Sequence, residues 1–304
     1  MSSFRSNDIP SLADNIIIVT GGNVGLGLET IRQLGEHNPA RIYLAARSSE
    51  KAETAIAELR KANPNISPIS FLKLDLSSFD SVKSAAAEFT SKESRLDILV
   101  NNAGIMMTDE GLSQEGFEIQ FGTNVMGPAL FTQLLLPTLR ETSKINPQTR
   151  VVMLASAAHA RSPADSYPFD ELKTIMSHRH TTARYTMSKL ADIHYAKALA
   201  EREKDVKIIP VHPGMVATNL HHASAGTFLK PFLYTAISLF ATPVEKGALS
   251  QIWAAVSPDA KSGQYYSPVG KAETGSKLCQ NHELQEQLFK WVQGHLSDHV
   301  KTLV

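Results

Sequence analysis

Residues Ile16–Gly27 read IIIVTGGNVGLG, a run of β-branched and aliphatic side chains that breaks off at a cluster of glycines. The apolar run predicts a buried strand. Glycines directly after a strand allow a tight turn, close approach of the backbone to a pyrophosphate, and close packing of helix on strand. A helical pattern follows, and its N-terminus offers free N–H groups to phosphate. Glycine turns also arise for conformational reasons alone, but after the first strand of an alternating series this one favours a nucleotide site.

Short apolar runs alternate with longer amphipathic segments along the rest of the chain, as repeated β-α-β units require. The apolar runs lack strict alternation, which is typical of parallel strands buried on both faces. We predict strands at Ile16–Thr20, Arg41–Ala45, Ile69–Leu74, Leu96–Val100, Arg150–Ala155 and Val206–His212. We predict helices at Gly25–His37, Ser49–Ala62, Phe79–Ser91, Phe117–Thr142 and Thr182–Lys204. No linker or repeat marks a second domain, so we expect one doubly wound α/β domain over residues 1–304.

Composition narrows the class of protein. The 304 residues are 42% apolar and 20% charged, with a formal net charge of zero, whereas a nucleic-acid binder needs a basic surplus. One cysteine, Cys279, rules out an intramolecular disulfide and is compatible with a reducing compartment. Residues 1–14 form a polar N-terminal extension without the apolar core of a secretory signal. We therefore expect a cytoplasmic protein.

The end of the second predicted strand discriminates between the two nicotinamide dinucleotides. An acidic residue there would bind the ribose 2′-hydroxyl of NAD, whereas an arginine suits the 2′-phosphate of NADP. This chain has Arg47 at that point and Lys51 one helical turn later, with no acid in the NAD position. Both are ordinary surface charges when taken alone. Together with the glycine turn, they favour recognition of a 2′-phosphate.

Tyr185 and Lys189 are four residues apart in a predicted helix, so their side chains share one face. A phenol is a poor acid–base catalyst at its free pKa of about 10. An ammonium group nearby favours the phenolate and moves that pKa toward neutrality. The spacing therefore suits an acid–base pair, although a tyrosine and a lysine at this spacing also arise by chance.

With these motifs in order, the chain resembles the short-chain dehydrogenase/reductase family, and more narrowly its retinol-dehydrogenase and WW-domain-oxidoreductase branch, from about Asn15 to about Leu296. The resemblance implies a Rossmann-type sheet of about seven strands in the order 3-2-1-4-5-6-7, with helices on both faces. The matching positions, besides the glycine turn, are Asp75, Asn101–Gly104, Asn124, Ser156, Tyr185 with Lys189, and Pro213-Gly214.

The resemblance also implies the catalytic roles. Tyr185 gives a proton to a carbonyl oxygen as nicotinamide delivers hydride to carbon, and Ser156 hydrogen-bonds the same oxygen. Lys189 lowers the pKa of Tyr185 and holds the nicotinamide ribose, while Asn124 helps to hold a water that connects Lys189 to solvent. Two oriented groups on the developing alkoxide would supply electrostatic stabilisation.

The remaining cofactor contacts follow from the same resemblance. Asp75 is expected near the adenine, and Val216 and Thr218 near the carboxamide and diphosphate. The full expected NADP(H) set is Gly21, Asn23, Gly25, Leu26, Gly27, Arg47, Lys51, Asp75, Leu76, Asn102, Ala103, Gly104, Tyr185, Lys189, Pro213, Gly214, Val216 and Thr218.

Two features depart from the wider family. Ser156 and Tyr185 are 29 residues apart, an insertion that we expect to line the substrate entrance and that the retinol-dehydrogenase branch shares. His159 follows Ser156 by three residues and suits either a substrate hydrogen bond or a structural role. Histidines elsewhere, such as His178/His180 and His221/His222, lack a matching carboxylate or cysteine set, so no metal site is expected.

The segment of about 219–245 is expected to cover the substrate. Its apolar part, Phe228–Phe240, indicates either a hydrophobic substrate or a helix that packs on the core. This part is too short to span a bilayer, but peripheral contact with a membrane remains open. A lipid-like aldehyde, an aromatic ketone and a polycyclic intermediate all remain candidates. The main hypothesis is NADPH-dependent reduction of an aldehyde or ketone to an alcohol. Dehydration, epimerisation or cyclisation at the same site, and a non-catalytic NADP(H) sensor, are the alternatives. The long helices Phe117–Thr142 and Thr182–Lys204 are candidate surfaces for a homodimer.

Overall fold

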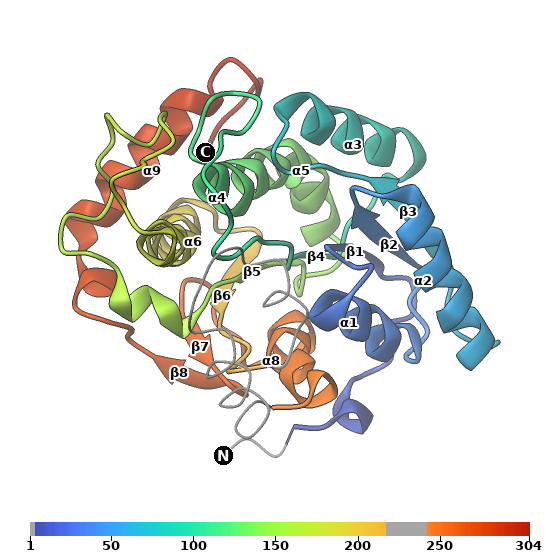
Figure 1. The fold of residues 1–304 in the computed structure, drawn as a ribbon. Helices are drawn as coiled ribbons and strands as arrows, with labels where there is room; N and C mark the ends of the chain where they lie inside the picture. The colour runs from blue at the N-terminus through green and yellow to red at the C-terminus, as the bar shows by residue number, and fades with distance from the viewer. Residues whose placement is uncertain (1–3, 217–241) are drawn as a thin grey trace.

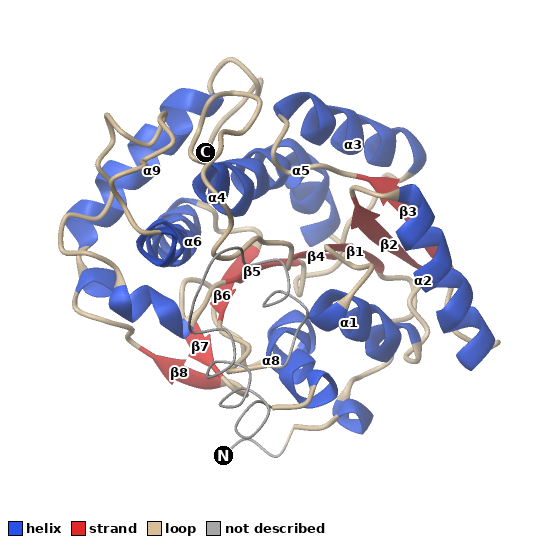
Figure 2. Ribbon diagram, viewed as in Figure 1, coloured by secondary structure: helices blue, strands red, loops and turns tan. Residues whose placement is uncertain are grey.

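The computed structural model describes residues 4–216 and 242–304 and has a single parallel-type sheet between two layers of helices (Figures 1 and 2). The strand order is β3-β2-β1-β4-β5-β6-β7-β8. This confirms the doubly wound α/β fold and the predicted order of the first seven strands. The strands are β1 (Ile16–Thr20), β2 (Arg41–Ala46), β3 (Ile69–Lys73), β4 (Ile98–Asn101), β5 (Arg150–Leu154), β6 (Lys207–Val211), β7 (Tyr265–Ser267) and β8 (Lys271–Glu273).

The eighth strand is an addition that the sequence patterns did not predict. Strands β1 to β7 pair in parallel, whereas β8 runs antiparallel to β7, with Tyr266 opposite Ala272. Both strands have only three residues, and β8 begins with the exposed Lys271. A segment this short and polar carries no apolar period, so hydrophobic patterning cannot detect it.

The helices fall into two layers, which Figure 1 shows on opposite sides of the sheet. One layer holds α1 (Gly25–Gly35), α2 (Ser49–Ala62) and α8 (Val244–Val256). The other holds α3 (Phe79–Lys92), α4 (Ile119–Phe121), α5 (Gly127–Ser143), α6 (Thr181–Arg202) and α9 (His282–Leu296). Single turns of other helix types lie at η1 (Ser6–Asp8), η2 (Gly122–Met126), η3 (Ala157–Arg161) and η5 (Leu278–Gln280).

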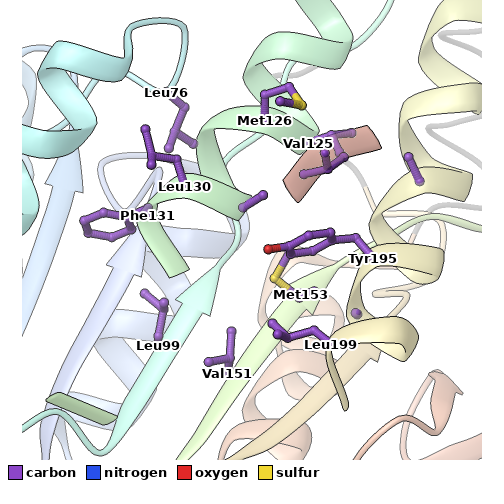
Figure 3. Packing of buried hydrophobic residues seen from close by; sticks show 14 of the residues in the cluster. Leu76, Leu99, Val125, Met126, Leu130, Phe131, Val151, Met153, Tyr195 and Leu199 are labelled. Carbon is purple, nitrogen blue, oxygen red and sulfur yellow. The ribbon is translucent and has the colours of Figure 1, made fainter. Parts of the chain in front are cut away.

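Alternate side chains of each strand enter two separate cores. Ile17 of β1 packs in the core under α1, α2 and α8, while its neighbour Ile18 packs in the core under α3, α5 and α6. Figure 3 shows the second core, where Leu99 and Val151 face Phe131 of α5 and Leu199 of α6. Burial on both faces explains why these strands read as continuous apolar runs.

The predicted helix Phe117–Thr142 is a less regular element than expected. It is a continuous run of α4, a π-helical turn η2 and α5. The turn η2 contains Asn124, and α5 then begins at Gly127 and continues through Pro137. Single π-helical turns within α-helices often accompany functional sites because they rotate one side chain out of the regular register.

The outer face of α6 is covered within the same chain. Helix α9 lies beside it in Figure 1 and packs against its C-terminal half, with Tyr195 stacked on Phe289 and Arg202 paired to Glu286. This contact covers one of the two helices that were candidates for a homodimer surface.

The structure describes most of the N-terminal extension but little of the expected substrate cover. In the N-terminal extension, Ile9 and Leu12 are buried against the core under α1 and α2. Most of the expected substrate cover, residues 219–241, lies outside the described residues, and α8 begins at Val244. Within the described ranges, no helix is both long enough and apolar enough to cross a membrane.

Candidate active site

A cavity of about 710 Å³ opens at the carboxyl ends of the central strands. This is the edge where the strand order reverses between β1 and β4, the general ligand position of doubly wound sheets. The predicted site residues that line it are Gly21, Asn23, Gly25, Leu26, Arg47, Asp75, Leu76, Asn102, Ala103, Gly104, Ser156, Tyr185, Lys189, Pro213, Gly214 and Val216. Gly27, Lys51 and Asn124 do not line it, and Thr218 lies outside the described residues.

The glycine turn suits an anionic ligand. Gly21 and Gly25 adopt positive φ angles of 64° and 55°, a backbone conformation that favours glycine. Gly27 packs against the carbonyl of Gly21, so a side chain at Gly27 has no room. Helix α1 begins without a side-chain cap and without an acidic residue in its first turn. Its free N–H groups and positive dipole end therefore face the cavity unopposed.

The ends of β1 and β4 are tied together beside this turn. Asn102 Nδ2 donates to the carbonyl oxygen of Thr20 over 2.7 Å, and the Ala103 N–H donates to Thr20 Oγ1 over 2.9 Å. Gln251 of α8 in turn donates to Asn102 Oδ1 over 3.2 Å. Asn102 thus supports the glycine turn from below, which gives its amide a structural task in addition to its place on the cavity wall.

At the end of β2, Arg47 is exposed and lines the cavity. Among the residues that the structure describes, none forms a hydrogen bond or ion pair with its guanidinium, which is therefore available to an anionic group. Lys51 lies in the first turn of α2 and does not reach the wall. Asp75 lies further along the same wall, where its Oδ1 accepts hydrogen bonds from the Ser77 N–H and hydroxyl over 3.0 and 2.7 Å.

Tyr185 and Lys189 share one face of α6, and both line the cavity. Lys189 Nζ donates to the carbonyl oxygen of Leu154 over 3.0 Å and to Asp192 Oδ2 over 2.7 Å. Burial favours the neutral amine, but the charges of Asp192 and Tyr185 outweigh it and raise the pKa of Lys189. The lysine is therefore a buried ammonium beside the phenol.

Ser156 follows β5 and caps the short helix η3, where its Oγ accepts a hydrogen bond from the Ala158 N–H over 3.1 Å. His159 lies below it, with Nδ1 2.7 Å from the Ser156 carbonyl oxygen and Nε2 3.2 Å from the Ser276 N–H. Because Nε2 accepts, the proton is on Nδ1, which donates to Ser156. Burial lowers the pKa of His159, so the ring is neutral. Both ring nitrogens are occupied, which favours the structural role for His159.

Asn124 lies behind the cavity wall rather than on it. Its Oδ1 accepts from the Ile105 N–H over 2.8 Å, and its Nδ2 donates to the Ile105 carbonyl and to Ser188 Oγ, each over 2.9 Å. A Cβ on Gly104 would lie 3.2 Å from Asn124 Oδ1 and 3.6 Å from Lys189 Nζ. Gly104 therefore separates the two side chains, and Asn124 holds the loop after β4 in place against α6.

Only the first part of the insertion between Ser156 and Tyr185 lines the cavity, namely Ala157, Ala158, Ala160 and Arg161. The rest packs on the helical layer: Tyr167 and Leu172 are buried in the core, and Phe169 contacts Trp291 of α9. The insertion therefore contributes to the described wall only through its first residues. Its apolar side chains are buried against α6 and α9 instead, where they lose contact with water.

His212 and Asp192 are among the residues of the site that the sequence analysis did not predict. His212, directly before Pro213, lines the cavity, and its Nδ1 is buried without a partner among the described residues. Asp192 contacts the ammonium of Lys189. The spacing of three residues between Lys189 and Asp192 on one helix face was the signal available for the second.

One group of potential metal ligands lies away from the cavity. Glu201, His282 and Glu286 bring one ligand atom each within 4.8 Å of one another. Arg202 already forms two hydrogen bonds with the Glu286 carboxylate, at 3.1 and 2.6 Å. The group is a surface ion-pair network between α6 and α9.

Comparison with known proteins agrees with this geometry. The family model described as "short chain dehydrogenase" matches residues 15–167. A short-chain dehydrogenase/reductase of Armillaria gallica is 36% identical over 298 residues, covering 96% of this chain and 94% of the relative. Retinol dehydrogenase 12 of Mus musculus is 33% identical over 278 residues, covering 90% and 84%. The crystal structure of NADPH-bound carbonyl reductase from chicken fatty liver superposes with a TM-score of 0.64 at 22% identity, covering 86% of this chain and 99% of that one.

The chain belongs to the short-chain dehydrogenase/reductase family. Within it, the chain is a member of the retinol-dehydrogenase-like branch. It is accordingly an oxidoreductase that uses a nicotinamide cofactor.

Proposed function

We propose that this protein reduces an aldehyde or ketone to an alcohol with NADPH as the cofactor, in a reversible reaction in which Tyr185 is the general acid. The observation that carries the proposal is the single cavity shared by the glycine turn, Arg47, Ser156, Tyr185 and Lys189. Cofactor recognition and acid–base groups thus lie along one continuous wall. That arrangement is what a hydride transfer between a bound dinucleotide and a carbonyl substrate needs.

The cofactor, when bound, supplies the hydride. The chain's own residues manage the charge that develops on the substrate oxygen. Tyr185 donates its proton to that oxygen, and the Ser156 hydroxyl donates a hydrogen bond to it. Lys189 holds a positive charge close to the phenol and thereby favours release of the phenolic proton. In the reverse direction the phenolate accepts the proton of the alcohol.

The preference for NADPH over NADH rests on Arg47. Its guanidinium lies on the cavity wall at the end of β2 and has no partner among the described side chains. A planar guanidinium binds phosphate oxygens with two parallel hydrogen bonds, which a ribose hydroxyl cannot match. Asp75 lies after the next strand, β3, and is engaged with Ser77, so it does not supply the acidic residue that NAD would require at this point.

A hydrophobic substrate is supported by the wall beyond Ser156. Ala157, Ala158 and Ala160 line it, and Met215 contributes an exposed apolar side chain beside Pro213-Gly214. An apolar wall with a few convergent polar groups is the general form of a site for a hydrophobic small molecule.

The proposal is tested by following NADPH oxidation with a panel of hydrophobic aldehydes and ketones, in parallel with NADH. Turnover with NADPH on at least one carbonyl, with weaker turnover on NADH, is expected. Tight NADPH binding with no oxidation on any carbonyl would instead favour non-redox chemistry or a sensing role. Equal use of NADPH and NADH would contradict the role given to Arg47.

A further inference from the structure

A cation without a counter-ion lies on the cavity wall beyond Ser156. Arg161, the last residue of η3, is exposed and lines the cavity. None of the residues that the structure describes forms a hydrogen bond or an ion pair with its guanidinium. The sequence of residues 217–241 contains no aspartate or glutamate, so that segment has no carboxylate to offer. Because an arginine keeps its positive charge in proteins, Arg161 presents an uncompensated charge to the cavity.

The acidic side chain nearest to Arg161 in the sequence is already engaged elsewhere. Asp165 follows Arg161 by four residues, and its two carboxylate oxygens accept hydrogen bonds from the guanidinium of Arg179 over 3.1 and 2.6 Å. Glu171 also lies close to Arg179, with Oε2 3.5 Å from Nε. The insertion thus pairs these charges within itself and leaves Arg161 out of the network.

The other charged residues on the described wall have tasks of their own. Arg47 is the proposed partner of the 2′-phosphate, and Lys189 is paired with Asp192. Asp75 supplies the one carboxylate of this wall and is bonded to its own loop. Arg161 is therefore the lining cation for which neither the cofactor nor the described part of the chain provides an anion.

The sheet separates Arg161 from the proposed phosphate site. Neighbouring strands lie about 4.8 Å apart, so the three intervals in the order β2-β1-β4-β5 place the ends of β2 and β5 about 14 Å apart. Arg47 follows β2, whereas η3 follows β5. Arg161 therefore belongs to the side of the cavity that carries Ser156.

The surface between Ser156 and Arg161 is apolar. Ala157, Ala158 and Ala160 line the cavity there. Five residues of a 3₁₀ helix, with a rise of about 2.0 Å each, place Arg161 about 10 Å from Ser156 along η3. A ligand that meets both side chains must therefore have an apolar middle part and two polar ends.

We propose that the substrate is an aldehyde or ketone with an apolar body and a carboxylate at its far end, about 10 Å from the carbonyl group, and that Arg161 binds this carboxylate. The inference rests on the proposed function, in which Ser156 and Tyr185 bind the carbonyl oxygen. A planar guanidinium binds a carboxylate through two parallel hydrogen bonds. A phosphate carries nearly two negative charges and would suit a site with more than one free cation.

The test measures the binding of two probes, 10-hydroxydecanoate and its methyl ester, by titration calorimetry. The chain is first loaded with NADPH, or with NADH if only the latter binds. An alcohol and a reduced cofactor form a dead-end complex, so no turnover takes place during the measurement. The probes share one hydroxyl and one apolar chain and differ by a single negative charge. The wild type is expected to bind the acid about tenfold more tightly than the ester, the scale of one charge-assisted hydrogen bond.

Arg161→Gln removes the charge and keeps a polar side chain at an exposed position. Its affinity for the acid is expected to fall about tenfold, while its affinity for the ester stays nearly unchanged. Arg161→Lys retains the charge without the planar fork and should keep part of the preference. Lys144→Gln, at an exposed residue after α5 and off the cavity wall, is the matched control. It removes the same charge and should change neither affinity.

Equal affinity of the wild type for acid and ester would overturn the proposal, as would a failure of both probes to bind. An unchanged preference in Arg161→Gln, or the same loss in Lys144→Gln, would also overturn it. A large fall in cofactor affinity in Arg161→Gln, measured when the chain is loaded, would assign Arg161 to the cofactor instead.

The fate of the proposed reductase activity is read separately, from the reduction of 10-oxodecanoate. If this aldehyde is reduced, Arg161→Gln should raise its KM about tenfold and leave kcat unchanged, since the carboxylate contact is made equally before and during hydride transfer. If the acid is bound selectively through Arg161 but no aldehyde is reduced, the proposed function fails and the anionic end of the ligand stands.

Discussion

Gly127, the first residue of α5, packs directly against the carbonyl group of Leu76, with no space between them for a side chain. Leu76 lines the cavity, and α5 continues from the turn that carries Asn124. The contact therefore fixes the distance between the loop after β3 and the helical run behind the active site.

Gly127→Ala is expected to lower the free energy of unfolding by about 1–3 kcal/mol, because the added methyl group forces the two backbones apart. Chemical denaturation measures the change. Gly294→Ala in α9 is the matched control, since nothing lies within 4 Å of its Cβ position. That substitution should stabilise the chain by about 0.5–1 kcal/mol through helix propensity. Comparable effects at both glycines would show that the Leu76 contact is unimportant.

Arg47→Ala is expected to weaken NADPH binding by about 10- to 100-fold, the range for losing a hydrogen bond to a charged group, and to leave NADH binding nearly unchanged. Titration calorimetry with each dinucleotide measures both affinities. Lys51→Ala, at an exposed residue off the cavity wall, is the control and should have a much smaller effect. A parallel loss for NADPH and NADH in Arg47→Ala would argue against recognition of the 2′-phosphate.

Asn124→Ala is expected to reduce stability by about 1–3 kcal/mol, because it leaves the N–H and carbonyl of Ile105 without their partners. It should also reduce turnover, because Asn124 holds in place the loop after β4, which packs next to Lys189. Thermal unfolding and kcat are the measurements. Asn124→Asp retains an acceptor for the Ile105 N–H but loses both donated bonds, so an intermediate loss is expected. Full activity and stability in Asn124→Ala would contradict this positioning role.

His194 predicts a pH dependence of stability. Its Nδ1 lies 3.1 Å from the Tyr167 hydroxyl and its Nε2 3.0 Å from the Leu278 carbonyl, and burial lowers its pKa from 6.5 to about 4. The unfolded chain therefore binds a proton at His194 that the folded chain does not bind. The contribution of neutral His194 to the free energy of unfolding is lost as pH falls from about 6.5 to about 4. Asp192, whose pKa burial raises to about 6, acts in the opposite sense, so the comparison must be between variants. Chemical denaturation of His194→Gln across this pH range should show a smaller loss of unfolding free energy than the wild type shows. An equal dependence on pH in the two proteins would be evidence against a neutral, buried His194.

Much of the fold was predictable because the central strands are buried on both faces. The predicted strand Ile16–Thr20 and helix Ser49–Ala62 agree with the structure at both ends. A predicted strand boundary differs from the structure where a residue is buried but takes no part in the hydrogen bonding of the sheet. Leu96 is fully buried and extends the apolar run, but the strand β4 begins only at Ile98. Leu96 instead donates its N–H to Thr142, a long-range contact that no local pattern contains.

The part of the site that lies in sequence motifs was predictable. The glycine turn, Ser156 and the pair Tyr185 and Lys189 lie on one cavity wall as expected. The place of Asn124 behind that wall depends on a π-helical turn, which sequence periodicity does not reveal. Asp192 escaped notice because an acid inside a helix usually faces solvent, and only the packing of α6 against the sheet buries it.

The most direct test of the central claim follows deuterium into the alcohol formed from a hydrophobic aldehyde, with NADPH that carries two deuterium atoms at C4 of the nicotinamide. The wild type is expected to give alcohol labelled at the carbinol carbon. Tyr185→Phe should still bind NADPH and should form product about 10²- to 10⁴-fold more slowly, the usual contribution of a general acid. Unlabelled alcohol, or undiminished turnover in Tyr185→Phe, would contradict hydride transfer assisted by this tyrosine.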